Sequence, residues 1–195
     1  MQDLFSHKYE ALNPQTFTLS DFDILNAGFK SPYSTLLYIL MRKSKAVDIY
    51  QTSITVGEKL PGNQSWHYHH IFPDANFDGE RQRIKNLIEE AEENGSEEDL
   101  KKLSEQMTRL EYSIYSIPNL AFLTPETNES IGDSEPSGYL NKIMSRPNGK
   151  EILEAQMIPT DPPLWKFNKF EEFRKKRTEI ILQRINEYLN KENLI

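Results

Sequence analysis

The chain has 195 residues, which is enough for one compact domain with a hydrophobic core. Its hydrophobic content of 37% and charged content of 27% are ordinary for a globular protein, and its net charge of −7 argues against a surface that is basic throughout. The absence of cysteine excludes disulfides and cysteine-based zinc sites. With no signal-peptide pattern and no run of about 18 apolar residues, we expect a cytoplasmic protein that does not span a membrane.

Residues 1–60 predict an N-terminal scaffold of helices and one strand. Ser20 can begin a short helix, and Ser31-Pro32 opens a longer one whose apolar residues cover nearly every side, so we expect it at the centre of the core. The composition of residues 46–56 is typical of a strand. Asp48 interrupts that apolar stretch, and we expect a solvated loop carboxylate there rather than a partner of a site residue.

Three of the four histidines lie within four consecutive positions, His67-Tyr68-His69-His70, directly before Ile71-Phe72-Pro73. In an extended strand, successive side chains point to opposite faces. His67 and His69 then share one face, and Tyr68 and His70 share the other. One histidine can therefore hold a metal while its neighbour faces a substrate. A surface strand that is merely rich in histidine is the alternative.

Residues 79–113 predict an antiparallel helical hairpin. Apolar residues at helical spacing occupy both halves, Asn94-Gly95 interrupts them, and Ser96 with Asp99 resembles a capping box. The predicted tip, residues 89–99, is strongly acidic, so we expect it to be solvated and to point away from any nucleic acid. Arg81, at the start of the first helix, is a candidate for contact with phosphates.

The stretch after the hairpin predicts a short buried strand, Asn119–Leu123, followed by a helix. Thr124 is a good N-cap and Pro125 suits the first helical position. Asn128 then lies about one turn into that helix, and Gly132 provides a stop. The sequence thus carries one asparagine at the strand and another on the helix.

Three further helices are predicted near residues 136–144, 150–158 and 168–190. Lys142 lies close to the histidine and asparagine segments in sequence and is a candidate nucleic-acid contact. The last helix carries the densest basic run, Arg174-Lys175-Lys176-Arg177. This run is either a solvated helix face or a surface that contacts phosphates.

The order of these features resembles the ββα-metal finger of HNH nucleases. The resemblance implies an α+β, mostly helical fold with a finger over residues 61–145, a helical-hairpin insertion over 79–113 and C-terminal helices over 146–195, all within a single domain of residues 1–195. It assigns His70 as the general base and His69 and Asn128 as metal ligands. Asn119 matches the residue that braces the loop aiming the base. His67 is either a third ligand or a hydrogen-bonding neighbour.

The stretches 119–140 and 153–159 and the last helix with Arg177 are also similar to the C-terminal HNH region of GmrSD-type restriction proteins. In those proteins a ParB-like nucleotide-binding domain precedes the nuclease half. No P-loop pattern is visible here, so the resemblance implies a separate subunit or a piece of a longer protein. An open site with two protein ligands suits Mg²⁺ or Mn²⁺, and His69 also permits Ni²⁺ or Zn²⁺.

We therefore expect a metal-dependent endonuclease that cuts DNA as the cutting module of a restriction or phage-defence system. Two alternatives remain open. One is a catalytically degenerate finger that only binds nucleic acid. The other is a metal-stabilised interaction subunit of a larger assembly.

Overall fold

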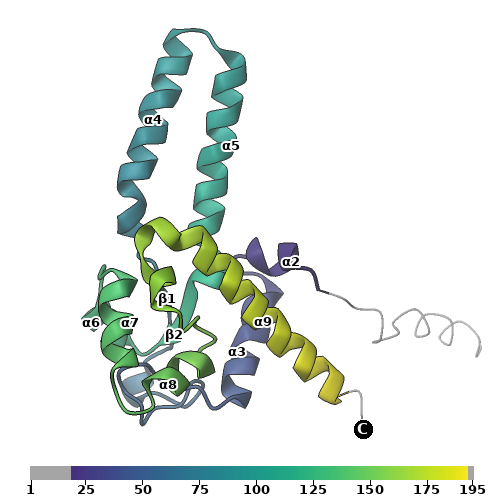
Figure 1. Cartoon of the computed structure of the whole chain (residues 1–195), viewed down its shortest axis with the longest axis vertical. Coiled ribbons are helices and arrows are strands. Elements are labelled where there is room, and N and C mark those ends of the chain that lie inside the picture. The colour runs from purple at the N-terminus through teal and green to yellow at the C-terminus, as the bar shows by residue number, and fades with distance from the viewer. Residues whose placement is uncertain (1–18, 193–195) are drawn as a thin grey trace, which may run out of the picture.

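The computed structural model describes residues 19–192, which form an α+β fold that is mostly helical around one small sheet (Figure 1). Residues 1–18, the first part of the expected N-terminal scaffold, lie outside the described residues. The strands are β1 (His67–His70) and β2 (Leu120–Leu123). The helices are α2 (Asp21–Leu25), α3 (Pro32–Lys43), α4 (Asp78–Glu93), α5 (Glu97–Ile114), α6 (Pro125–Ile131), α7 (Pro136–Met144), α8 (Gly149–Ala155) and α9 (Phe170–Glu192).

The sheet joins two segments that are far apart in the sequence. β1 and β2 are antiparallel, with His67 opposite Leu123 and His70 opposite Leu120. The pairing continues past β1, because the Ile71 amide donates to the Asn119 carbonyl at 2.8 Å. β2 leads directly into α6, which contacts β1. The histidine strand and the short helix that follows β2 are therefore neighbours.

Strand β2 is buried on both faces and separates two clusters of apolar side chains. Ala121 and Leu123 point into one cluster, and Phe122 points into the other, as the alternation of a strand requires. Helix α9 contributes to both clusters, with Phe173 in the first and Ile181 in the second. The long C-terminal helix therefore ties together the two sides of the sheet.

The predicted helical hairpin is confirmed. Helices α4 and α5 contact each other along their lengths and extend together away from the sheet, with their connection at the far end (Figure 1). The capping box is present only in part: the Ser96 hydroxyl donates to the Asp99 carboxylate at 2.6 Å, while the Ser96 side chain caps no backbone amide. The acidic tip lies at the far end of the hairpin from the sheet (Figure 1). Its expected orientation away from nucleic acid stays a prediction.

Two expectations for the secondary structure and packing of the N-terminal region are wrong. Helix α3 is present, but Ile39 is 39% exposed, so the core covers only one side of it. Residues 46–56 form no strand; a single bridge between Val47 and Thr55 replaces it. The cause is Asp48, whose carboxylate accepts hydrogen bonds from the backbone amides of residues 50 and 51 and so competes with strand pairing.

The C-terminal half follows the sequence closely. The Thr124 hydroxyl accepts a hydrogen bond from the Thr127 amide at 3.2 Å and caps α6, as predicted. Helix α7 has the predicted bounds, and α8 and α9 differ from theirs by a few residues. Among residues 19–192, no helix has both the length and the apolar composition that crossing a membrane requires.

Candidate active site

The last two residues of β1, His69 and His70, face opposite sides of the sheet. His69 is 4% exposed and points inward, with its ring centroid 6.0 Å from that of Tyr139. His70 is half-buried on the other face, where its ring meets Tyr115 edge-on at 5.0 Å between centroids. The strand thus gives two adjacent histidines different surroundings, as its alternation predicts.

Helix α6 brings Asn128 against the inward face of β1. Its side-chain oxygen lies 2.9 Å from Nδ1 of His69, across 59 residues of sequence. The side-chain nitrogen of Asn128 lies 3.4 Å from Nδ1 of His67. These two contacts group His67, His69 and Asn128 on one side of the strand.

His69 and Asn128 have the chemistry of a ligand pair. Burial lowers the pKa of His69 to about 4, so its imidazole is neutral at pH 7, the form that a metal ligand must have. Adjacent ligands of an octahedral ion with bonds of about 2.0–2.1 Å are about 2.9 Å apart. The Nδ1–Oδ1 separation of 2.9 Å fits that arrangement and is also the length of an ordinary hydrogen bond.

The described residues offer a metal few anionic ligands. Among residues 19–192, no group of three or more histidine, aspartate or glutamate side chains is placed to hold an ion. Nε2 of His69 is buried and has no hydrogen-bond partner in that part of the chain. An ion between His69 and Asn128 would therefore need water or substrate oxygens to complete its coordination.

Asn119 braces the turn that follows β1. It is fully buried, its side-chain oxygen accepts from the Phe72 amide at 2.8 Å, and its side-chain nitrogen donates to the Phe72 carbonyl at 3.1 Å. The same nitrogen donates to the Ile114 carbonyl at 2.9 Å, at the end of α5. Because Phe72 is two residues after His70, this paired contact restricts the backbone that carries the His70 ring.

The outer face holds a polar network around His70. Burial is the largest cause that lowers the pKa of His70, nearby Arg81 lowers it further, and the Asp74 carboxylate opposes them. Tyr115, which contacts the His70 ring, donates its hydroxyl hydrogen to Asp74 at 2.7 Å. His70 is therefore neutral at pH 7 and able to accept a proton.

Arg81 is not the free phosphate contact that its position in the sequence indicated. Its guanidinium donates to the carboxylates of Asp74, Asp78 and Glu111 and to the Asp74 carbonyl. These contacts use all of the N–H groups that an arginine has. Arg81 therefore braces the base of the hairpin beside His70.

The basic run on α9 is not a continuous exposed surface. Arg177 is fully buried and donates to the carbonyls of Pro118, Gln156 and Met157, and burial lowers its pKa to about 9. Arg174 is 3% exposed and donates to two serine hydroxyls, Glu171 and the Leu25 carbonyl. The predicted phosphate contacts at both arginines are therefore wrong.

The lysines among the candidate nucleic-acid contacts remain at the surface. Lys175 and Lys176 are exposed on α9, and Lys176 forms an ion pair with Glu179 at 2.7 Å. Lys142 is exposed on α7. The helical spacing explains the difference, because Arg174 and Arg177 are three residues apart and face the core together, while the two lysines between them face outward.

Asp48 is the site-positioning residue that sequence reasoning missed. It is fully buried rather than solvated. Its carboxylate accepts from the Thr124 amide at 2.8 Å and from the Thr127 hydroxyl at 2.6 Å, at the start of α6. Asp48 thus holds the first turn of the helix that carries Asn128. The one sequence signal was its position between two apolar residues, Val47 and Ile49.

No protein-family model, no curated protein and no solved structure matches this chain. The chemical properties of the site are therefore those of its own residues. They provide a neutral buried imidazole beside an amide oxygen on one face of β1, and a second neutral imidazole on the other. The buried Asn119 side chain restrains the turn between β1 and the hairpin of α4 and α5.

Proposed function

We propose that the chain is a metal-dependent endonuclease that hydrolyses phosphodiester bonds of DNA, with β1, β2 and α6 forming an HNH-type ββα-metal finger. The observation that carries the proposal is the grouping of four residues from distant segments. His69 contacts Asn128 across 59 residues, and Asn119 contacts the backbone of Phe72, two residues after His70. A strand that is merely rich in histidine needs neither asparagine contact.

His70 is the proposed general base. Its ring is neutral at pH 7, because burial lowers its pKa, and it is only half-buried, so water can reach it. A neutral imidazole that takes the proton from a water molecule makes that water a better nucleophile toward phosphorus. Asn119 keeps the following turn in one conformation, and the edge of the Tyr115 ring limits how far the imidazole can rotate.

His69 and Asn128 are the proposed ligands of a divalent cation, Mg²⁺ or Mn²⁺, with Ni²⁺ or Zn²⁺ also compatible with an imidazole ligand. Such an ion, when bound, neutralises charge on the scissile phosphate and on the leaving oxygen. The role of Asp48 is to hold the first turn of α6, so that Asn128 stays opposite His69. The contact of His67 Nδ1 with the side-chain nitrogen of Asn128, at 3.4 Å, supports the role of a hydrogen-bonding neighbour, and ligation by His67 stays the alternative.

Target choice is proposed to reside outside these residues, in a partner subunit or in a ParB-like domain of a longer protein within a defence system. The support is that three of the candidate phosphate contacts, Arg81, Arg174 and Arg177, are engaged within the fold. Of the predicted contacts, Lys142, Lys175 and Lys176 remain exposed for phosphates. Contacts to phosphate carry no base-specific information. The chain alone should cut with little sequence preference.

The proposal is tested by incubating supercoiled plasmid with the purified chain and Mg²⁺ or Mn²⁺, with and without a chelator. Cutting should require the metal. His69→Ala and Asn128→Ala should each lower the rate and raise the metal concentration needed, so that excess metal partly restores cutting. Asp133→Asn, an exposed change just after α6, is the matched control and should leave the metal requirement unchanged.

Three results would contradict the proposal. Cutting that persists in chelator would remove the metal from the reaction. A mobility shift without cutting would favour a degenerate finger that only binds DNA. Metal-dependent melting without DNA binding would favour an interaction subunit.

A further inference from the structure

The face of β1 that carries His70 continues into a group of exposed aromatic side chains. Tyr68 shares that face and is 45% exposed, and its ring lies 5.8 Å from that of Phe29. Tyr115, from the end of α5, contacts the His70 ring on the same side. Aromatic rings thus lie both against His70, at Tyr115, and farther along the same side, at Tyr68 and Phe29.

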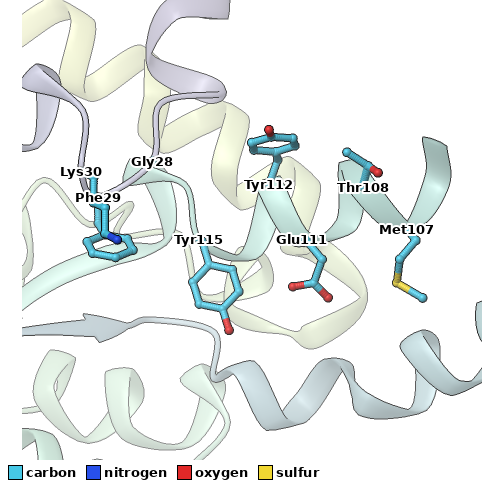
Figure 2. A pocket seen from close by; sticks show the side chains of 8 residues that line it. All are labelled: Gly28, Phe29, Lys30, Met107, Thr108, Glu111, Tyr112 and Tyr115. Atoms are coloured by element: carbon cyan, nitrogen blue, oxygen red, sulfur yellow. The ribbon is translucent and has the colours of Figure 1, made fainter. Parts of the chain in front are cut away.

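Between Phe29 and Tyr115 lies a pocket of about 510 Å³, which is within the usual size range of small-ligand sites. One wall is the segment Gly28–Lys30, which is joined to the end of α5 by a bridge between Gly28 and Ser116. The other wall is α5. Figure 2 shows Phe29 and Lys30 on one side, and on the other the α5 side chains Met107, Thr108, Glu111 and Tyr112 together with Tyr115, which directly follows α5.

The chemistry of the pocket suits a flat aromatic ligand that is linked to phosphate. Tyr112 is 64% exposed and Phe29 is 37% exposed, so their rings are available for stacking. The carboxylate of Glu111 is paired with Arg81, which offsets its negative charge. The Lys30 ammonium, 5.5 Å from the centre of the Phe29 ring, adds a cation at the same wall.

We propose that this pocket binds an unpaired nucleobase of the DNA strand that is cut, by stacking on Phe29 and Tyr112, with Lys30 contacting a neighbouring phosphate. The inference rests on the proposed function, because it is the shared wall at Tyr115 that connects the pocket to His70. It adds that the DNA strand held beside His70, the proposed general base, is locally unpaired. Stacking on aromatic side chains accepts any base, which agrees with cutting of low sequence preference.

The test measures binding separately from cutting. Two fluorescent single-stranded oligonucleotides of equal length are compared by anisotropy in the presence of a chelator: one of thymidine throughout, and one with a central run of abasic sites. Both have the same number of phosphates, so they differ only in the bases available for stacking. The chain should bind the thymidine oligonucleotide about tenfold more tightly.

Variants locate the difference on the molecule. Tyr112→Ala should remove most of the preference for the thymidine oligonucleotide, and Tyr112→Phe, which keeps the ring, should retain it. Phe22→Ala is the matched control, because Phe22 is 74% exposed and does not line the pocket. All of these residues are partly or largely exposed, so the variants should fold, which a melting curve verifies.

The outcomes separate this inference from the proposed function. If plasmid cutting depends on metal but both oligonucleotides bind equally, the proposal that the pocket binds a nucleobase is overturned and the proposed nuclease activity stands. A base-dependent preference that Tyr112→Ala removes, without any cutting, supports the pocket and contradicts the nuclease. Failure to bind either oligonucleotide overturns the pocket. A dimer in sedimentation that Tyr112→Ala dissociates assigns the pocket to a second copy of the chain and also overturns the inference.

Discussion

Two groups of polar residues stand out in the sequence, the histidine strand with its distant asparagines and the basic run on α9, and they have different surroundings in the fold. The first group is brought together at the sheet, with His70 left partly exposed and His69 paired with Asn128. The second group is divided, because Arg174 and Arg177 are buried while Lys175 and Lys176 face outward.

The difference shows when the sequence alone predicts which polar side chains of a run reach the surface. The spacing of the histidines within a strand decides which face each one takes, whatever lies on that face. On a helix, consecutive residues point in different directions. When one side of the helix packs against the core, a run of four cations therefore cannot have all of its side chains on the surface that would contact a substrate. The apolar residues Phe170, Phe173 and Ile181 turn the arginine side of α9 toward the core.

The largest expected effect tests the catalytic side of this comparison. His70→Ala should lower the rate of plasmid cutting by about 10²–10⁴-fold, because the reaction loses its general base. Unfolding by urea and metal affinity should change little, since the ring is half-buried and lies on the face opposite His69. A variant that cuts at nearly the original rate at neutral pH would show that His70 is not the base.

The next effect tests the structural side. Arg177→Leu should lower the free energy of unfolding by about 3 kcal/mol or more, because three buried carbonyl oxygens lose their donor. Lys176→Gln is the control and should change it by less than about 0.5 kcal/mol, because its ion pair with Glu179 is exposed. If urea denaturation gave similar values for the two variants, the assignment of Arg177 to the core would fail.

A smaller effect tests whether the buried carboxylate of Asp48 also positions α6 and its residue Asn128. Asp48→Asn keeps the side-chain shape but replaces one of the two accepting oxygens by an NH2 group, which then faces at least one backbone N–H donor. We expect a loss of about 2 kcal/mol in unfolding free energy and a higher metal requirement for cutting, because the start of α6 loosens around Asn128. A variant that loses stability but keeps the original metal requirement would limit Asp48 to a role in folding.

The smallest effect is a shift in pH dependence. The pKa of His70 is lowered mainly by burial, so the ring stays neutral and active below its ordinary value of about 6.5. Cutting should therefore be lost only as pH falls through a midpoint below 6.5, measured in single-turnover rates. Asp74→Asn should move the midpoint lower still, because the Asp74 carboxylate favours the protonated ring. A midpoint above 6.5 would contradict the burial of His70.

Most helices and the alternation of the histidine strand were predictable from the sequence, because both depend on local spacing. The hairpin of α4 and α5, the Thr124 cap and helix α7 follow from apolar periodicity and capping residues. The opposite surroundings of His69 and His70 follow from the pleat of a strand. The contact between Asn128 and His69 was expected from the family resemblance, because local spacing does not relate residues so far apart.

Only the tertiary structure decided which charged residues are buried or engaged by other elements of the fold. Asp48 lies in a stretch with strand-like composition, yet its carboxylate bonds to amides and a hydroxyl from two segments of the chain, which local patterns do not reveal. Arg81 and Arg177 resemble surface cations in the sequence and are engaged by carboxylates or carbonyls from other elements. A polar group is buried when the fold supplies its hydrogen-bond partners, and those partners come from segments that the sequence places far away.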